Sequence, residues 1–505
     1  MAAPNPDDAR TAAVEEAVTA RLEPSQEFVD RLARTRDLLV ERARAIAQEQ
    51  GIPLERALVA GSAARGTFLN DRLDVDLFLL FPLGTSRERL VEGGLAIGRA
   101  LLERPILRYA EHPYLRGEFG GFAVETVPGY AVADPGSPVS AVDRTPFHQE
   151  YLAQRQTPEM VREVRLAKSF LRRIGAYGSE ARTAGFSGYL VELLVLRFGT
   201  FRALLRSARG WRLPAWLDPA APTDALRVPE DVALVLLDPV DPDRNVASAL
   251  SRRNLARFVL AADAYLQAPE ETAFGASVGS ALTAAAALDR VRARGTHVAS
   301  VRFDRPELVD DILYPQLRKA ERALAVEVDR LGFTLLGSAS AAGTEGLIVL
   351  LETAEERLST VEVRRGPPAG IDRGSEFLRA WRERSDRILQ GPYVTVQGEL
   401  AVDVRRAETA LVALLTEALP RLSLGKNLQP LVARAQVGRL EPTTGGDALP
   451  EALAELLDKR LPWEASTDRG KPSTEPASPG PGQPTRGRRS GEGTRARASP
   501  SPRPR

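Results

Sequence analysis

The spacing of apolar and polar residues changes several times along the chain, and each change marks an expected element. From Ser25 onward, apolar side chains recur at three- and four-residue intervals until Gly51, which predicts a helix with Ser25 as its N-cap. Shorter apolar runs separated by turn residues follow, and these are typical of strands. The elements expected next are strands at Leu58–Ala60, Asp74–Phe81 and Phe122–Val132, a turn at Gly61–Gly66 and a helix at Arg87–Leu102.

The rest of the pattern predicts further domains. Thr157-Pro158-Glu159 combines an N-cap, a proline at the first helical position and an acid in the first turn, so a helical region begins there and extends to about Gln267. Helix and strand patterns then mix between about 300 and 450. The elements expected there are helices at Asp310–Leu331 and Ser375–Gln390 and strands at Phe333–Ala342, Leu347–Ala354, Tyr393–Val396 and Leu400–Val404. The expected domains are 1–155 (α+β) and 156–268 (helical), followed by 269–365 as the first part of a C-terminal α/β domain and 366–464 as a tail and the remaining C-terminal part. Residues 465–505 are expected to form a disordered basic tail.

Composition narrows the class of protein. The chain has 505 residues, of which 43% are hydrophobic and 27% charged, as in ordinary soluble multi-domain proteins. No apolar run approaches the roughly 20 residues of a membrane helix, and the N-terminus lacks a signal-peptide pattern. The absence of cysteine excludes disulfides, thiolate metal sites and cysteine nucleophiles. We therefore expect a cytoplasmic protein with no membrane partner.

Charge is unevenly distributed. The net charge is +1, but residues 466–505 carry nine basic and three acidic residues, so the remainder is slightly acidic. Any contact between the folded domains and nucleic acid must therefore come from local patches. The tail arginines would add weak, salt-sensitive attraction to RNA, and solubility or compositional drift explains them equally well.

Three acidic residues form the sharpest candidate site. Asp74 and Asp76 are two apart on one expected strand, so both carboxylates point to the same face, and Glu125 stands on another expected strand. Carboxylates on a buried strand must be paired or bound to metal, and three of them suit a two-Mg²⁺ phosphoryl-transfer site. Gly61-Ser62, at the preceding turn, suits a phosphate. The alternative is a turn-ending Asp74 and a surface Asp76, and the pair alone leaves both interpretations open.

Lys168 is unusual in this chain because only five of its 68 basic residues are lysine. On the helix that starts at Pro158, it projects between Val161 and Val164 at the edge of the apolar face. A compact point charge at that place would suit triphosphate oxygens, and a snorkelling lysine is an equally weighted alternative. The three histidines, His112, His148 and His297, are too scattered for a metal-ligand motif.

Several motifs together resemble one family. The segments Gly61–Leu69 and Asp74–Phe78 look like the GS…DxD signature of polymerase-β-type nucleotidyltransferases. Longer stretches resemble the archaeal-type (class I) CCA-adding tRNA nucleotidyltransferases, most densely between about 55 and 260. These stretches are Ala110–Tyr114, Val127–Tyr130, Ala141–His148, Gly175–Glu180, Gly185–Tyr189 and Asp238–Val246, with Gly366–Pro368 and Gly391–Tyr393 beyond them.

The resemblance implies an α+β fold and an activity. A polymerase-β-like head with a mixed sheet would precede a helical central domain and an RRM-like α/β C-terminal domain with an inserted tail domain. The enzyme would add C, C and A to the 3′ end of tRNA from CTP and ATP, without a template and with release of pyrophosphate. Mg²⁺ would be bound by Asp74, Asp76 and Glu125. The nucleotide would be held by Ser62, Arg65, His148, Lys168 and Tyr177, with Arg244 near the incoming base.

Some of these assignments have alternatives. The family pattern has an aspartate where this chain has Glu125, whose extra methylene would either be tolerated or reduce metal affinity and rate. Without the family resemblance, Arg244 could be a surface arginine. Without its motif, His148 could be a structural hydrogen-bonding residue.

Other nucleotidyltransferases and binding proteins remain as rivals to this reading. A poly(A) polymerase-like enzyme and an RNA-binding relative weakened in catalysis are the two rival functions. The acceptor arm of tRNA is the expected RNA partner, and a homodimer is compatible with the sequence. The residues below are candidate tRNA contacts, and the alternative for each is that it belongs to a solvent-exposed charged surface. They are Arg364, Arg365, Arg379, Trp381, Arg382, Arg384 and Tyr393.

Overall fold

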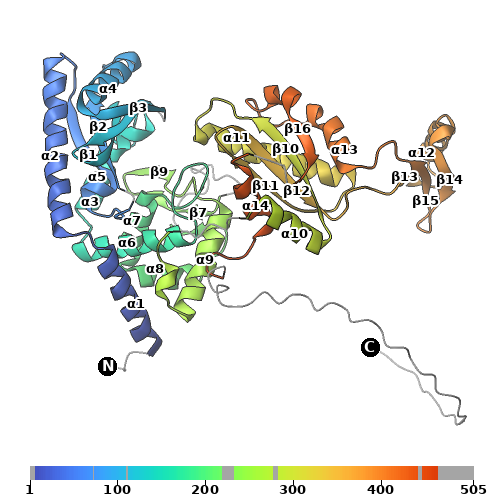
Figure 1. Cartoon of the computed structure of the whole chain (residues 1–505), viewed down its shortest axis with the longest axis horizontal. Coiled ribbons are helices and arrows are strands. Elements are labelled where there is room, and N and C mark those ends of the chain that lie inside the picture. Colours follow the sequence, from blue (N-terminus) through green and yellow to red (C-terminus); the bar gives the residue numbers. More distant parts are fainter. Residues whose placement is uncertain are drawn as a thin grey trace, which may run out of the picture. The chain divides into compact units, whose positions relative to one another are not determined.

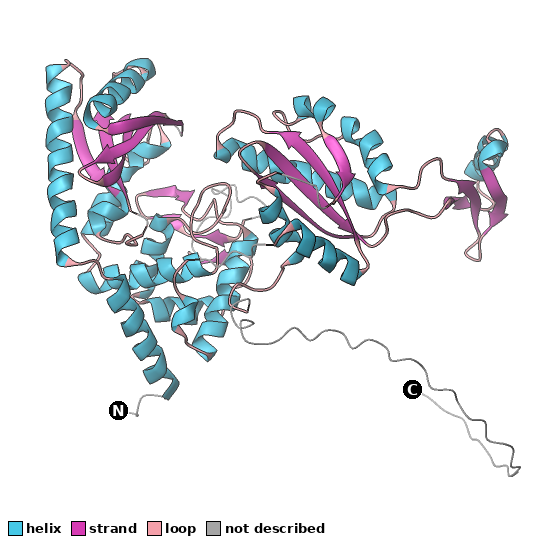
Figure 2. Ribbon diagram, viewed as in Figure 1, coloured by secondary structure: helices cyan, strands magenta, loops and turns pink. Residues whose placement is uncertain are grey.

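The computed structural model describes residues 6–464, except residue 72 and the ranges 110–111, 219–231, 277–281 and 442–445 (Figure 1). The expected basic tail at 465–505 lies outside the described residues. Helices and several separate sheets alternate along the chain, which confirms the α+β class (Figure 2). Among the residues described, none of the helices combines the length and hydrophobicity that a bilayer crossing requires.

The N-terminal part contains a five-stranded mixed sheet of order β1-β2-β5-β4-β3, in which only β2 and β5 are parallel. One face of the sheet is apolar and packs against two helices, α2 and α4. The other face carries the acidic residues of β2 and β5. The strands are β1 (Arg56–Ala60), β2 (Asp74–Phe81), β3 (Glu103–Tyr109), β4 (Pro113–Phe119) and β5 (Phe122–Tyr130); the helices are α2 (Gln26–Glu49), α3 (Gly61–Arg65) and α4 (Arg87–Leu101).

The structure differs from the sequence-based expectations for this sheet at one turn and by two additional strands. The segment Gly61–Gly66 forms the short helix α3 and not a simple turn, and Ser25 caps α2 as expected by accepting a hydrogen bond from the Phe28 backbone N–H. Strands β3 and β4 were not expected. All of β3 is solvent-exposed at the sheet edge, so its sequence lacks the alternation of buried and exposed positions that marks a strand.

The middle of the chain packs helices around an aromatic cluster that includes Phe170, Phe201 and Tyr265. Thr157 caps α6 by accepting from the Met160 backbone N–H, and Pro158 is its first residue, as the sequence predicts. Short strands interrupt the expected helical pattern. The helices are α1 (Pro6–Leu22), α5 (Thr145–Ala153), α6 (Pro158–Arg173), α7 (Gly188–Phe198), α8 (Phe201–Ala208) and α9 (Arg252–Gln267), with 3₁₀ turns at Ala141–Arg144 and Glu271–Ala273; the strands are β6 (Ala215–Trp216), β7 (Leu234–Val235), β8 (Leu237–Asp238) and β9 (Asp241–Asn245).

The C-terminal part is built on a four-stranded antiparallel sheet of order β11-β12-β10-β16. Alternate residues of β12 enter two cores, Val349 with α11 and α13 and Leu350 with α10 and α14, so helices cover both faces (Figure 2). The strands are β10 (His297–Asp304), β11 (Leu335–Ala342), β12 (Gly346–Thr353) and β16 (Gln436–Arg439); the helices are α10 (Ala284–Arg294), α11 (Asp310–Leu331), α13 (Leu411–Ala418) and α14 (Leu449–Leu457), with 3₁₀ turns at Leu419–Arg421 and Gln429–Arg434.

A small separate domain is inserted between β12 and α13. Its three-stranded sheet has the order β13-β15-β14 and carries one helix, α12. The expected helix Ser375–Gln390 is wrong at its end, because the chain turns at Ser385–Arg387 and Ile388 begins β14. The elements are β13 (Val361–Pro368), α12 (Asp372–Arg382), β14 (Ile388–Val394) and β15 (Glu399–Arg405).

Glycine lets α4 approach the N-terminal sheet closely. A Cβ at Gly98 would lie 2.6 Å from the Thr126 hydroxyl oxygen and 2.9 Å from a methyl group of Leu115. A Cβ at Gly84, in the loop before α4, would meet nothing within 4 Å.

We predict that Gly98→Ala destabilises the N-terminal domain by about 1–3 kcal/mol, because the added methyl overpacks the helix–sheet contact. Gly84→Ala is the control and should unfold like the wild type. Calorimetric melting of the full chain measures both variants; an unchanged first transition in Gly98→Ala would contradict the close contact.

Candidate active site

Three carboxylates lie on one face of the N-terminal sheet, where β2 and β5 run side by side. Asp76 is in parallel register with Glu125 and also pairs with Ala60 at the end of β1. Asp74 is two residues before Asp76 and shares its face, whereas Val75 between them is buried in the core on the opposite face. The structure therefore brings together the three acids that the sequence singles out.

Burial and neighbouring negative charge raise the pKa values of Asp76 and Glu125. Burial, then the charges of Glu125 and Asp74, raise the pKa of Asp76 to about 7. Burial and the charge of Asp74 likewise raise the pKa of Glu125. Crowded like charges of this kind are stabilised by a cation placed between them.

Arg116 supplies part of that positive charge, and sequence reasoning missed it. Its Nη2 lies 2.7 Å from Asp74 Oδ1 and its Nη1 lies 3.5 Å from Glu125 Oε1. Arg116 stands opposite Glu125 in the antiparallel register of β4 and β5. Because β4 was not recognised in the sequence, nothing there could have indicated that Arg116 meets the acids.

The donor set suits a hard divalent cation. Three carboxylates provide only oxygen ligands, and the raised pKa values of Asp76 and Glu125 indicate that the local negative charge is not fully compensated. Within the described ranges, however, no group of three or more acidic or histidine side chains has a finished metal-binding arrangement. The residues therefore fit a divalent ion in chemistry, and binding would require them to rearrange.

The Gly61-Ser62 pair lies directly against the carboxylates. Gly61 has φ +73°, and a Cβ there would come within 2.5 Å of Asp76 Oδ2, so backbone conformation and space both favour glycine. Ser62 follows in α3 and is thereby placed next to the acidic face. The structure thus places the Gly61-Ser62 motif beside the Asp74 and Asp76 carboxylates.

Glu192 of α7 is a second residue that sequence reasoning missed. Its side chain is 1% exposed and accepts hydrogen bonds from Arg65 Nε at 2.6 Å and Lys168 Nζ at 3.1 Å. The Thr67 hydroxyl donates to it at 2.7 Å. Burial raises its pKa, but the charges of Lys168 and Arg65 and the hydrogen bonds from Arg65 and Thr67 outweigh this and lower the pKa to about 2. Two expected nucleotide-binding cations are thus held by one buried carboxylate.

Lys168 is fully buried, so neither of its sequence-based interpretations describes it completely. Its ammonium donates to Glu192, to the Thr67 carbonyl at 2.9 Å and to the Thr67 hydroxyl at 3.2 Å. Tyr177 lies nearby: a Cβ at Gly188 would be 3.3 Å from the Tyr177 hydroxyl and 3.7 Å from Lys168 Nζ. The absence of a side chain at Gly188 leaves space beside both groups.

The two remaining expected residues meet at a third buried carboxylate, Asp238. His148 Nε2 lies 2.8 Å and Arg244 Nη1 2.6 Å from Asp238 Oδ2. The residue after His148 in α5, Gln149, accepts a hydrogen bond from Arg65, which connects this group to the Glu192 group. The nine expected residues therefore fall into three connected clusters, organised by the acidic face, by Glu192 and by Asp238.

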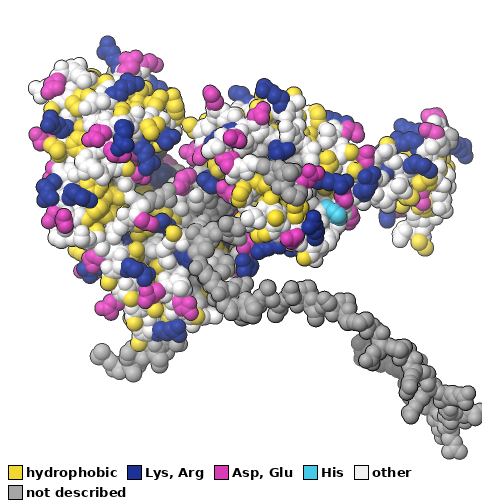
Figure 3. Space-filling model, viewed as in Figure 1, with side chains coloured by type: hydrophobic (Ala, Val, Ile, Leu, Met, Phe, Trp, Pro, Cys, Tyr) yellow, Lys and Arg dark blue, Asp and Glu magenta, His cyan; other side chains and the backbone are white. Residues whose placement is uncertain are grey.

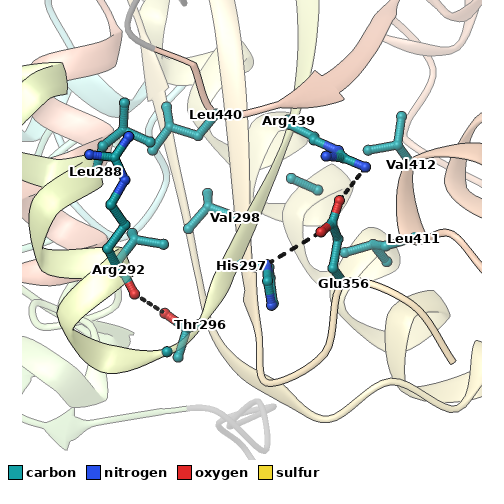
Figure 4. A pocket seen from close by; sticks show the side chains of 13 residues that line it. Leu288, Arg292, Thr296, His297, Val298, Glu356, Leu411, Val412, Arg439 and Leu440 are labelled. Carbon is teal, nitrogen blue, oxygen red and sulfur yellow. Dashed lines mark hydrogen bonds and ion pairs between the residues drawn. The ribbon is translucent and has the colours of Figure 1, made fainter.

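A pocket of about 400 Å³ lies elsewhere, in the C-terminal part between α10, β10, α13 and β16 (Figure 4). At its edge Glu356 forms ion pairs with Arg439 and, at 3.8 Å, with His297 Nδ1. None of the nine expected residues lines this pocket. His297 has an ion-pair partner there, consistent with the structural role that its isolated position in the sequence indicates.

Comparison with known proteins identifies the family. Residues 40–148 match the nucleotidyltransferase domain, residues 162–275 the second domain of tRNA nucleotidyltransferases, and residues 294–437 the C-terminal domain of CCA-adding enzymes. Among solved structures, the Cid1 poly(U) polymerase aligns with 53% of this chain and 99% of its own at 12% identity and a TM-score of 0.41, too distant to support an argument.

Curated relatives match over nearly their full lengths. The CCA-adding enzyme of Haloarcula marismortui is 39% identical over 428 residues, which cover 82% of this chain and 90% of that protein. The enzyme of Halobacterium salinarum is 37% identical over 89% of this chain and 97% of its own, and that of Thermoplasma acidophilum is 36% identical over 81% and 91%. The chain belongs to the CCA-adding enzyme family of tRNA nucleotidyltransferases.

Proposed function

We propose that the acidic face of β2 and β5 is the catalytic centre at which the protein adds C, C and A to the 3′ end of tRNA, with CTP and ATP as nucleotide donors. The observation that carries the proposal is the convergence of Asp74, Asp76 and Glu125 beside Gly61-Ser62, in a chain of the CCA-adding family. The family membership removes the reason to favour a poly(A) polymerase. Cytoplasmic location and a homodimer stay predictions.

Mg²⁺ is the ion that we assign to Asp74, Asp76 and Glu125. Bound there, it would neutralise charge on the reacting phosphates and favour the ionised tRNA 3′-hydroxyl. The carboxylates themselves must be ionised to serve as ligands, so the proton that Asp76 retains near pH 7 has to leave on binding. Arg116 must release Asp74 at the same time, because it donates to the same oxygen set.

The triphosphate is assigned to Ser62, Arg65, His148, Lys168 and Tyr177. Lys168 already uses all three of its donors within the protein, so contact with a phosphate oxygen requires it to exchange one partner. Arg65 is held through two of its three nitrogens, by Glu192 and Gln149. Arg244, with 37% of its side chain exposed, is available to the incoming base.

The inserted domain is the surface that we assign to tRNA. Figure 3 shows Arg and Lys side chains gathered on one side of this domain, next to hydrophobic ones. Arg384 lies over the Trp381 ring at 5.9 Å, and Arg364 and Arg365 are exposed on β13. Arginine and aromatic side chains together suit phosphate contact and stacking at an RNA end or loop.

The function is tested by incubating the purified protein with Mg²⁺, a tRNA lacking its CCA end, and labelled CTP or ATP. Two C and one A followed by arrest are expected. Long A-tails would point to a poly(A) polymerase, and tRNA binding without any incorporation would point to a weakened relative. In that last case Glu125→Asp, which restores the family's shorter acid, is the next variant to assay.

In the same assay, Asp76→Asn should lower nucleotide addition by about 10³-fold, because a ligand that stabilises transition-state charge is worth several kcal/mol. Binding of tRNA should stay within about twofold of wild type. Asp289→Asn, on the exposed surface of α10, is the matched control and should remain fully active. Nucleotide addition at the wild-type rate by Asp76→Asn would contradict a catalytic role for these carboxylates.

Glu192→Gln should destabilise the protein by about 3–5 kcal/mol at pH 7, because it leaves Arg65 and Lys168 buried without a counter-ion. Since the folded-state pKa of Glu192 is lowered, its stabilising effect is complete above the unfolded pKa of 4.5 and is lost as pH falls towards about 2. Urea unfolding of both proteins at pH 7 and pH 3 measures the difference. A stability gap that does not narrow at pH 3 would contradict an ionised Glu192.

Arg364→Ala combined with Arg365→Ala should weaken tRNA binding and reduce the salt dependence of log Kd by about one to two units of slope, as expected for the loss of two phosphate contacts. Filter binding between low and moderate salt gives the slope. The pair Arg10→Ala and Arg292→Ala removes two exposed arginines elsewhere and serves as the control. Equal effects of both pairs would indicate general charge attraction and not a docking surface.

A further inference from the structure

Asp238 is a buried carboxylate with four hydrogen-bond donors around it. Its Oδ2 accepts from His148 Nε2 at 2.8 Å and Arg244 Nη1 at 2.6 Å; its Oδ1 accepts from the Tyr189 hydroxyl at 3.0 Å and the Val240 backbone N–H at 3.1 Å. The side chain has no solvent exposure. Burial raises the pKa of Asp238, but the hydrogen bond and charge of His148 and the bonds from Val240 and Arg244 lower it overall, so the carboxylate is ionised.

The donors come from separate parts of the fold. His148 is on α5, Tyr189 lies in the first turn of α7, and Arg244 is on β9 opposite β8, which ends at Asp238. The His148 ring also stacks on Tyr189, with ring centroids 4.1 Å apart. Burial and the charge of Asp238 raise the pKa of the Tyr189 hydroxyl, which therefore remains a donor. Asp238 thus contacts both the expected phosphate-binding histidine and the expected base-selecting arginine.

We propose that Asp238 is a positioning residue that couples the hold on the triphosphate by His148 to the selection of the base by Arg244. This inference rests on the function proposed above. A carboxylate at Nε2 accepts a hydrogen bond from that nitrogen and fixes the orientation of the ring. The Nδ1 atom can then hold a phosphate oxygen only as an N–H donor, and the negative charge of Asp238 favours protons on both ring nitrogens. The same Asp238 oxygen fixes Arg244 through Nη1 and leaves the rest of its partly exposed guanidinium to meet a base.

The consequence is that two properties change together when Asp238 is altered. Loss of its charge frees the His148 ring and the Arg244 guanidinium at once, whereas a change at either donor affects mainly one of them. His148→Gln should raise KM for CTP and ATP with little effect on which base is added. Arg244→Lys should raise misincorporation of UTP and GTP with a smaller effect on KM.

The decisive variant is Asp238→Asn, which keeps the shape of the side chain but removes its negative charge and replaces one acceptor oxygen with an NH₂ donor. We expect KM for CTP and ATP to rise about tenfold and misincorporation of UTP to rise about tenfold in this single variant, with a smaller fall in kcat. Asp238→Glu, which keeps the charge, should show the same two defects to a lesser degree. Unchanged KM and base selection, or a change in only one of them, would overturn the proposal.

A matched control separates positioning from stability. Glu352 is equally buried and accepts hydrogen bonds from Arg294 and Thr296 in the C-terminal part. Glu352→Gln should lower the melting temperature without altering KM or selectivity, and the same result for Asp238→Asn would show a structural role only. If Asp238→Asn does not fold, Asp238→Glu carries the test.

Calorimetric binding of CTP and UTP distinguishes failure of this inference from failure of the proposed function. A wild-type protein that binds CTP but adds nothing to tRNA would refute the function, while loss of the CTP preference in Asp238→Asn would still support coupling. Equal preference in both proteins would refute coupling. A wild-type protein that binds neither nucleotide would overturn both.

Discussion

The repulsion among Asp74, Asp76 and Glu125 is the constraint on which the rest of the site depends. Three acids share one face of two adjacent parallel strands, and burial together with their mutual charge raises the pKa of Asp76 to about 7. A carboxylate in such a place is either protonated or compensated by nearby positive charge. Arg116, on β4, supplies part of the compensating positive charge. A divalent cation between the carboxylates would supply the rest.

Compensation of buried charge recurs at two other places, where a single carboxylate faces several basic side chains. Glu192 and Asp238 are buried carboxylates, and the donors around each include residues that we propose to bind the nucleotide. They connect segments far apart in sequence: Glu192 joins α7 to Arg65 in the N-terminal domain, and Asp238 joins β8 to His148. The long basic side chains that we propose to bind the nucleotide are thereby held in place by the protein itself, and such preorganisation lowers the entropic cost of binding.

Some helices and strands could be predicted from the sequence and others could not, and the difference has physical reasons. Helices α2 and α4 were recognisable because burial on one face imposes a period on their sequences, and the caps Ser25 and Thr157 marked the starts of α2 and α6. Strand β2 was recognisable as a continuous apolar run because both of its faces are buried beyond Asp76. Strand β3 escaped notice because an exposed edge strand has no buried face to impose a pattern. The end of α12 was misplaced because its exposed surface leaves the helical period without a hydrophobic stripe at the boundary.

The sequence by itself determined the family, the three acids, the Gly61-Ser62 motif and the residues expected around the nucleotide, because these are local patterns of residue type and spacing. Only the tertiary structure decided which oppositely charged residues pair with the three acids and with the expected nucleotide-binding residues. Arg116, Glu192 and Asp238 belong to no motif that names them as partners, and each acts on residues that come from other strands or helices. Charge pairing in a buried site depends on distances set by the whole fold, and spacing along the chain does not encode those distances.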